Sequence, residues 1–446
     1  MTERLDLAKE KIFPLIFKMS WPSVIAMTAM SLYNFIDTFW LARLSSEALA
    51  ALTVCFPIQL TAGAIGMGTG VGAGSFAARM FGAGQNIQSQ KTAGQTLTLS
   101  FFFGLIMILA VLLFGDLIIL IFGATDEIKP LCHDYLYIIA FSAPFGLFTM
   151  IAANLLRAEG RPLFSMYVFS VAFISSMILD PLFIFGMGPF PRMEIKGAAV
   201  AALISNVLSF ALALFFLMLK SSKYKLKLKL KYSIPDIKII KSIYSTGIPS
   251  IVINVTGGLV LLIYNHVLAN FGFHTIGAFG ICFRIMSVAT MVVLGIGAGL
   301  MPVVGFSEGA RLDQRLRESV FAALQIALIF SLIAFLFMEI FAAGIVGLFS
   351  SDLAVLGIAT NALRIHASAL LLIAPIIIFI YTFMGLGKGT LAMIFLFLRD
   401  SLIFIPLLIL LPSFWGITGV WMALPFTNAI ALLVLIFWTK KLLRGK

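Results

Sequence analysis

Twelve long apolar runs, separated by short charged or Pro/Gly-rich breaks, limit what this chain can fold into more than any other feature of the sequence. Most runs are about 20 residues or longer, which is the length that a helix needs to cross hydrocarbon, whereas a spanning strand needs about 10 alternating residues. With 61% apolar and 11% charged residues, a soluble fold would expose far too much apolar surface. Helices satisfy their own backbone hydrogen bonds in lipid. The sequence therefore predicts an all-α polytopic membrane protein.

The predicted spans lie near residues 14–40, 50–78, 93–122, 133–157, 163–188, 196–220, 244–270, 277–305, 318–348, 357–385, 390–412 and 416–439. Most of the 31 Lys and Arg residues lie at the two ends of the chain and in loops after even-numbered spans. The loops after odd-numbered spans hold only Arg43, Lys129, Arg192 and Lys196. By the positive-inside rule, we expect a multi-pass protein of the inner (plasma) membrane with both termini in the cytoplasm. The net charge of +12 mostly reflects this topology, so no nucleic-acid partner is expected.

The two halves of the chain repeat each other in order. Tyr33–Asn34 corresponds to Tyr264–Asn265, the Gly-rich end of span 2 corresponds to Gly295–Gly299, and Gly197–Asn206 corresponds to Gly419–Asn428. We expect two pseudo-symmetric six-helix bundles, residues 1–220 and 244–446, joined by a basic cytoplasmic linker at 221–243. Parallel repeats of this kind place the substrate path at their interface.

Asp37 and Asp180 are acids that lie in apolar runs of the first half. Asp37 lies within span 1 and Asp180 follows the apolar run of span 5. An ionised carboxylate in hydrocarbon is costly unless it is protonated, paired or faces water, so such residues indicate a functional site. Each can carry a proton or bind a small cation. The repeat places Leu268 opposite Asp37, which indicates that the coupling chemistry is concentrated in the first half.

Other reactive residues give weaker signals. Arg399 and Asp400 are sequence neighbours, so on a helix they are expected to point to different faces and to pair with other groups. The three Cys residues have no metal or disulfide spacing and are interpreted as packing residues. The sequence has no HExxH, GxSxG or Walker A motif, so it predicts neither an enzyme nor a cofactor. Transport would then depend on an ion gradient.

Several stretches resemble the multidrug and toxic compound extrusion (MATE) family of transporters. They are SWP at 20–22, YNFIDTFWLARLSSEALAA at 33–51, GAGSFAARMFGAGQ at 72–85, NLLRAEGRP at 154–162, ILDPLFIFG at 178–186 and GAAVAALISN at 197–206. Their order and spacing are more specific than any one of them. The acids of spans 1 and 5 are similar to the DinF-like branch, since spans 7 and 10, which carry acids in the NorM-like branch, contain none.

The resemblance implies which residues form the site. Ion coupling would involve Asp37, Asp180, Asn154 and Ser176, and substrates would contact Tyr33, Asn34, Asn154 and Met286. Some members bind Na⁺ with an Asn before the span-5 acid and a Thr on span 6, but here those positions are Ser176 and Ala202. A hard cation needs several oxygen ligands, so this departure favours H⁺, although a Na⁺ site at Asp37, Asp180 and Ser176 stays open.

The function implied by the resemblance is a secondary active multidrug efflux antiporter. It would export small amphipathic or cationic organic compounds, and so confer drug resistance, in exchange for inward H⁺, with Na⁺ as the alternative. We expect a monomer in the lipid bilayer. Three other functions stay open: a flippase for lipid-linked oligosaccharides from the same superfamily, a passive channel, and an intramembrane enzyme. A flippase would be expected to line its cavity with several cations, and a channel would not need acids that change protonation.

Overall fold

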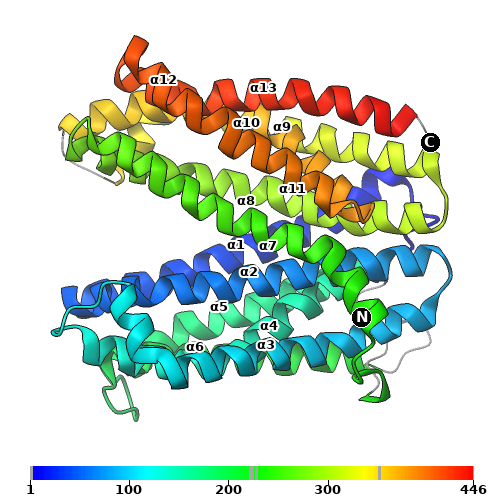
Figure 1. The fold of residues 1–446 in the computed structure, drawn as a ribbon, viewed down its shortest axis with the longest axis horizontal. Coiled ribbons are helices and arrows are strands. Elements are labelled where there is room, and N and C mark those ends of the chain that lie inside the picture. Colours follow the sequence, from blue (N-terminus) through cyan, green and yellow to red (C-terminus); the bar gives the residue numbers. More distant parts are fainter. Residues whose placement is uncertain (1–3, 220–225, 227–229, 350–352, 445–446) are drawn as a thin grey trace. The chain divides into compact units, whose positions relative to one another are not determined.

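The computed structural model describes residues 4–219, 226, 230–349 and 353–444, and every regular element in these ranges is helical (Figure 1). The first half contains α1 (Ile12–Leu44), α2 (Ser46–Gly82), α3 (Asn86–Ile121), α4 (Lys129–Ala158), α5 (Pro162–Phe185) and α6 (Glu194–Met218). The second half contains η1 (Leu230–Tyr232), α7 (Ile237–Ala269), α8 (Phe273–Gly309), α9 (Asp313–Gly347), α10 (Leu353–Gly385), α11 (Gly389–Phe397), η2 (Leu398–Phe404), α12 (Ile405–Trp415) and α13 (Ile417–Arg444).

Eleven helical stretches in the described residues are long and apolar enough to cross a membrane, with Gly389–Trp415 counted as one. This confirms the predicted all-α polytopic membrane fold. Local chemistry explains several boundaries. The Ser45 hydroxyl accepts a hydrogen bond from the backbone N–H of Ala48 at 3.0 Å and caps α2. Pro162 occupies the start of α5, where no N–H is needed, and Gly186 ends that helix with a φ of 71°.

The chain forms two compact units. The first unit contains Ile25–Ile251 together with the residues up to Asp6, and the second contains Leu7–Val24 together with the residues from Val252. The divisions therefore fall inside α1 and α7, just after Pro22 and Pro249. A proline removes one backbone hydrogen bond from a helix, so both helices are locally weakened near the points where they pass from one unit to the other. The division into bundles at the linker 221–243 stays a prediction.

Glycines on two corresponding helices let a neighbouring backbone approach closely. In the first unit, a Cβ added to Gly68 of α2 would lie 2.8 Å from the carbonyl oxygen of Gly247 on α7. In the second unit, a Cβ added to Gly299 of α8 would lie 2.8 Å from the Cα of Ser20 on α1. Small residues allow such close packing of membrane helices. The repeated glycines thus seat the first part of α7 on α2 and the first part of α1 on α8.

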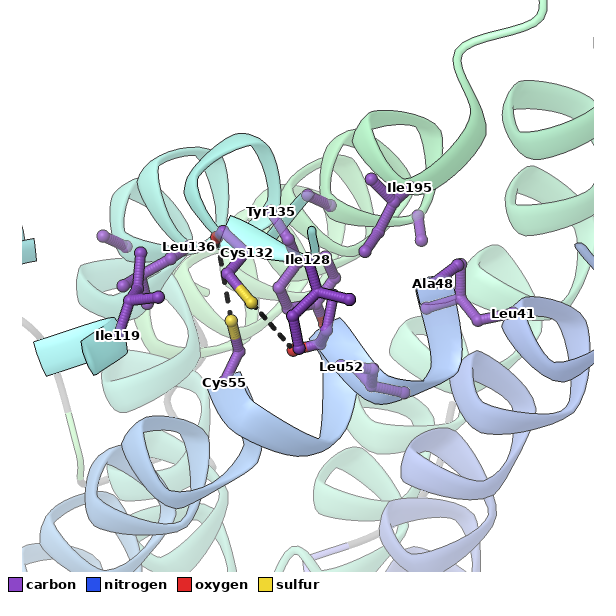
Figure 2. Packing of buried hydrophobic residues seen from close by; sticks show 14 of the residues in the cluster. Leu41, Ala48, Leu52, Cys55, Ile119, Ile128, Cys132, Tyr135, Leu136 and Ile195 are labelled. Carbon is purple, nitrogen blue, oxygen red and sulfur yellow. Dashed lines mark hydrogen bonds between the residues drawn. The ribbon is translucent and has the colours of Figure 1, made fainter. Parts of the chain in front are cut away.

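A buried apolar cluster joins α1, α2, α3, α4, α5 and α6 in the first unit (Figure 2). The thiols of Cys55 and Cys132 point toward each other within it, and each donates to a backbone carbonyl, of Cys132 at 3.7 Å and of Ala51 at 3.8 Å respectively (Figure 2). All three Cys residues are free and buried. Their surroundings agree with a packing role, since a free Cys behaves as a small apolar side chain.

The segment before α7 lies on α3. The buried side-chain amide of Gln95 donates to the carbonyl oxygens of Tyr232 at 2.8 Å and Ile234 at 2.9 Å, and its oxygen accepts from the N–H of Asp236 at 3.2 Å. The Thr98 hydroxyl donates to the carbonyl of Ser233. These bonds satisfy polar backbone groups that would otherwise be exposed at the edge of an apolar helix. We call residues 230–236 the strap.

Candidate functional site

Asp37 and Asp180 lie together inside the first unit, on α1 and α5. Asp37 is 4% exposed and Asp180 is fully buried. The two carboxyl groups are within hydrogen-bonding reach of each other. Two ionised carboxylates at this separation would repel each other strongly in a medium of low polarity. The sequence predicted both acids, and the structure places them in one pocket.

Ser176 lies between the two acids. Its hydroxyl is 2.9 Å from Oδ2 of Asp180, one helical turn further along α5, and 3.3 Å from Oδ1 of Asp37. A serine hydroxyl has one proton, so it can donate to only one of these carboxyl groups at a time. Oδ1 of Asp180 is buried and receives no hydrogen bond from another donor among the described residues. A second proton shared between the acids would satisfy the remaining oxygen atoms.

Polar groups from other helices surround the pair. Tyr33 lies one turn before Asp37 on α1, and its hydroxyl lies near the Asn206 side chain of α6. Tyr135 of α4 is buried near Asp37, and its hydroxyl accepts a hydrogen bond from the Gln59 side chain of α2 at 2.6 Å. Tyr33 was predicted from the sequence, whereas Tyr135, Gln59 and Asn206 were not. The only available signal was that each is a polar residue within an apolar span.

The other predicted residues lie elsewhere. The amide of Asn154 donates to the carbonyl of Met150 at 2.9 Å and accepts from Arg157 at 2.9 Å, and neither bond involves an acid of the pair. Asn34 is on α1 beside Tyr33, but its side chain lies outside the described part of the structure. Met286 is on α8, in the second unit, and is half-buried. Substrate contacts at these positions stay a prediction.

The span-6 position that bears a Thr hydroxyl in some Na⁺-binding members bears a methyl group here. No group of three or more His, Cys, Asp or Glu side chains that could hold a metal ion occurs among the described residues. Ala202 is fully buried on α6, and its methyl group supplies no oxygen where a Thr would. Its backbone carbonyl already accepts a hydrogen bond from Asn206 at 3.0 Å. Hard cations need a more complete oxygen shell than this.

Arg399 and Asp400 form an ion pair at 2.9 Å in the second unit, which corrects the expectation that they point apart. Both lie in η2, a π-helix, and its wider turn changes the directions of adjacent side chains. Arg399 also donates to the Asn428 side chain of α13 at 3.0 Å. The second unit therefore neutralises Asp400 with a cation, whereas the first unit brings two acids together.

Comparison with known proteins agrees with this architecture. The MatE family matches residues 22–182 and 249–410, one match in each half of the chain. The chain belongs to the MatE family. This confirms the predicted family and the membrane-transporter class, and it agrees with the prediction that the chain is not an enzyme. The DinF-like branch stays a prediction.

Individual relatives cover nearly the whole chain. An FAD transporter of Shewanella oneidensis is 29% identical over 436 residues, 96% of this chain and 95% of that protein. The multidrug export protein MepA of Staphylococcus aureus strain N315 is 28% identical over 415 residues, 92% and 90% of the two chains. The outward-facing structure of a multidrug resistance MATE family transporter of the MOP superfamily superposes with a TM-score of 0.93 at 25% identity, covering 100% of this chain and 99% of that one.

Proposed function

We propose that this MatE-family transporter exports amphipathic organic cations in exchange for inward H⁺, with Asp37 and Asp180 as the proton-binding pair. The observation that carries the proposal is the arrangement of two buried carboxyl groups around one serine hydroxyl, with Oδ1 of Asp180 lacking another donor among the described residues. A proton held between the acids removes a buried charge and supplies the missing hydrogen bond. Ala202 stands at the span-6 position where some Na⁺-binding members have a Thr, and the loss of that hydroxyl ligand supports H⁺ over Na⁺.

Coupling follows when the protonated and ionised pairs favour different helix arrangements. Asp37 and Tyr33 are on α1, and this helix passes from the second unit to the first just after Pro22. In the proposed cycle, protonation lets the two acids pack closely. When both are ionised, the two carboxylates repel each other or attract a cationic substrate. Only such a difference in interaction can shift a conformational equilibrium. The drug and the proton would then occupy the pocket alternately.

Purified protein in proteoliposomes tests the proposal directly. We expect efflux of a fluorescent amphipathic cation such as ethidium under an imposed pH gradient, and no comparable efflux under an equal Na⁺ gradient. Efflux driven only by Na⁺ would replace H⁺ by Na⁺ as the coupling ion. Movement of the dye without any counter-ion dependence would indicate a passive channel. In cells, we expect the transporter to lie in the inner membrane with both termini in the cytoplasm. We also expect it to act as a monomer.

A flavin nucleotide is a second candidate substrate, because a relative similar over 96% of the chain is named as an FAD transporter. FAD carries a negatively charged pyrophosphate, which an ionised pair of acids would repel. A protonated pair would not. Export of FAD from the same vesicles is therefore a direct second arm of the experiment. Transport of FAD but not of any organic cation would assign the protein to flavin export.

A further inference from the structure

A groove lies on the surface of the second unit where α1 and α9 begin. It has a volume of about 380 Å³ and is lined by Ile12, Phe13, Arg317, Glu318, Phe321, Ala322 and Gln325. Phe13 is 50% exposed and Phe321 is 62% exposed. Arg317, Phe321 and Gln325 follow one another at intervals of four residues, so they form one stripe along α9. The groove thus has a cation near its open end, aromatic walls and a polar amide further along an apolar helix.

The corresponding place in the first unit is filled. Counted from the first helical residue, the strap rests on the ninth, tenth and thirteenth residues of α3, which are Gly94, Gln95 and Thr98. The ninth, tenth and thirteenth residues of α9 are Phe321, Ala322 and Gln325. In the second unit, the segment before α1 is held by Arg315, which donates to the carbonyls of Leu7 at 2.7 Å and Glu10 at 2.8 Å, and the groove beside it stays open. Among the described residues, no chain segment fills this place in the second unit as the strap does in the first.

We propose that this groove binds an anionic phospholipid. Arg317 would contact the phosphate, the Gln325 amide would hydrogen-bond to a glycerol ester, and one acyl chain would lie against Phe13 and Phe321. Side chains on a helix lean toward its N-terminus, so the Gln325 amide reaches toward the membrane surface. Basic pockets between membrane helices near the surface are suited to acidic headgroups. The bound lipid would brace the first part of α1 against α9, as the strap braces α7 against α3.

Charge and exposure favour a lipid over other occupants. Exposed Lys9 and Lys11 lie just before the groove residue Ile12 in the chain, and Glu10 between them is paired with Lys18 at 3.0 Å, so this segment carries net positive charge. Glu318 already accepts a hydrogen bond from Gln314 at 2.8 Å, which lessens its repulsion of a phosphate. An exposed amide such as Gln325, on a helix with an 18-residue stretch of mean hydropathy 2.6, needs a hydrogen-bond partner that hydrocarbon cannot supply. A lipid ester supplies it. A soluble cationic substrate would be repelled by the surrounding cations.

Native mass spectrometry of the delipidated full-length protein, titrated with phosphatidylglycerol, tests the proposal. We expect Arg317→Gln to weaken binding of the tightest lipid at least about fivefold, which corresponds to the loss of one cation at a membrane surface. Gln325→Leu should weaken it at least about twofold, and this variant makes the helix more apolar and so preserves folding. Arg364→Gln is the matched control, because Arg364 is a partly exposed cation of the same unit, paired with Glu339 at 3.7 Å.

Three further ligands decide the chemistry. Phosphatidylcholine should bind more weakly than phosphatidylglycerol, and inorganic phosphate should not displace the lipid. The proposal is overturned if Arg317→Gln and Gln325→Leu both bind phosphatidylglycerol as the wild type does, or if Arg364→Gln loses as much affinity as Arg317→Gln. Displacement of the lipid by inorganic phosphate would show a simple anion site, and displacement by ethidium would show a substrate site. Lipid loss that accompanies dimer formation would show that a second copy covers the groove.

Discussion

Tyr33 and Tyr264 are 231 residues apart, at matching positions on the first helix of each half, and their surroundings differ in charge. Tyr33 neighbours Asp37, Asp180 and Asn206. The Tyr264 hydroxyl instead contacts Nε2 of His366 at 3.2 Å and donates to the carbonyl of Val420 at 3.3 Å. The same helix position thus serves a charged site in the first unit and an uncharged, hydrogen-bonded one in the second.

A buried residue near each tyrosine also follows the same repeat. Tyr135 and His366 are also 231 residues apart, on α4 and α10, and both are buried. Around Tyr264 the space is filled by aromatic rings, with Phe279 stacked at 4.3 Å and Phe404 at 5.6 Å between centroids. Stacked rings add packing energy, and they fill the space around Tyr264 with apolar groups. The comparison indicates that a repeated scaffold can keep its polar positions while only one copy places carboxyl groups beside the tyrosine.

Replacing Asp37 by Asn should have the largest effect on transport. The variant removes the charge and the titration of one acid, while an amide of the same shape still hydrogen-bonds to Ser176. We expect pH-gradient-driven efflux to fall at least about tenfold, with normal insertion into the membrane. Glu339→Gln, which removes an acid of the second unit that is 43% exposed, is the matched control and should stay within about twofold. Wild-type rates for Asp37→Asn would refute the functional difference between the units.

Breaking the ion pair of the second unit should affect stability more than coupling. Asp400→Asn leaves the Arg399 guanidinium without its charged partner in the membrane. Removing one partner of a buried pair costs about 3–5 kcal/mol, and the side-chain exposures of 12% and 19% place this pair at the low end. We expect a lower melting temperature in detergent but a pH-gradient dependence that is retained by the folded protein. The double variant Arg399→Gln with Asp400→Asn should regain stability, because it leaves no unpaired charge.

Much of this architecture was predictable, because apolar runs of helical length and charges within them are strong local signals. Asp37 and Asp180 stand out for that reason, and the repeat showed that Leu268 replaces the first acid in the second half. Ser176 was predicted from resemblance, and its place between the acids agrees with its position one turn before Asp180. These inferences depend on residues that are close in sequence or identical in both halves.

The remaining contacts depend on tertiary packing. Gln59 and Tyr135 are 76 residues apart and form a 2.6 Å hydrogen bond. No sequence pattern in either helix indicates this bond. Arg399 and Asp400 pair because η2 is a π-helix, whereas side chains of adjacent residues on an α-helix diverge. The contacts of Gln95 with the strap likewise connect residues more than 130 positions apart. Sequence periodicity describes one helix at a time, so it cannot show which polar groups meet.

Removing the hydroxyl between the acids should have an intermediate effect. Ser176→Ala deletes a hydrogen bond to a carboxylate, which is worth about 1.5–3 kcal/mol, but it keeps both titrating groups. We expect pH-gradient-driven efflux to fall about fivefold, less than in Asp37→Asn. Ser209→Ala is the matched control, because the buried Ser209 hydroxyl donates to the carbonyl of Val168 at 2.7 Å and touches neither acid. Equal losses in the two variants would show that Ser176 acts only through packing.

The two matched tyrosines should give the smallest and most direct test of the comparison. Tyr264→Phe loses the contacts with His366 and Val420 but keeps the stacked ring, so we expect about 1 kcal/mol of destabilisation and transport within about twofold of wild type. Tyr33→Phe removes a hydroxyl beside Asp37 and should lower gradient-driven efflux about threefold at similar stability. Melting curves and vesicle efflux, measured on both variants, separate the two outcomes. If Tyr264→Phe weakens coupling as much as Tyr33→Phe, the second unit takes part in proton transfer. His366, which loses its contact with the Tyr264 hydroxyl in that variant, would then be the titrating group.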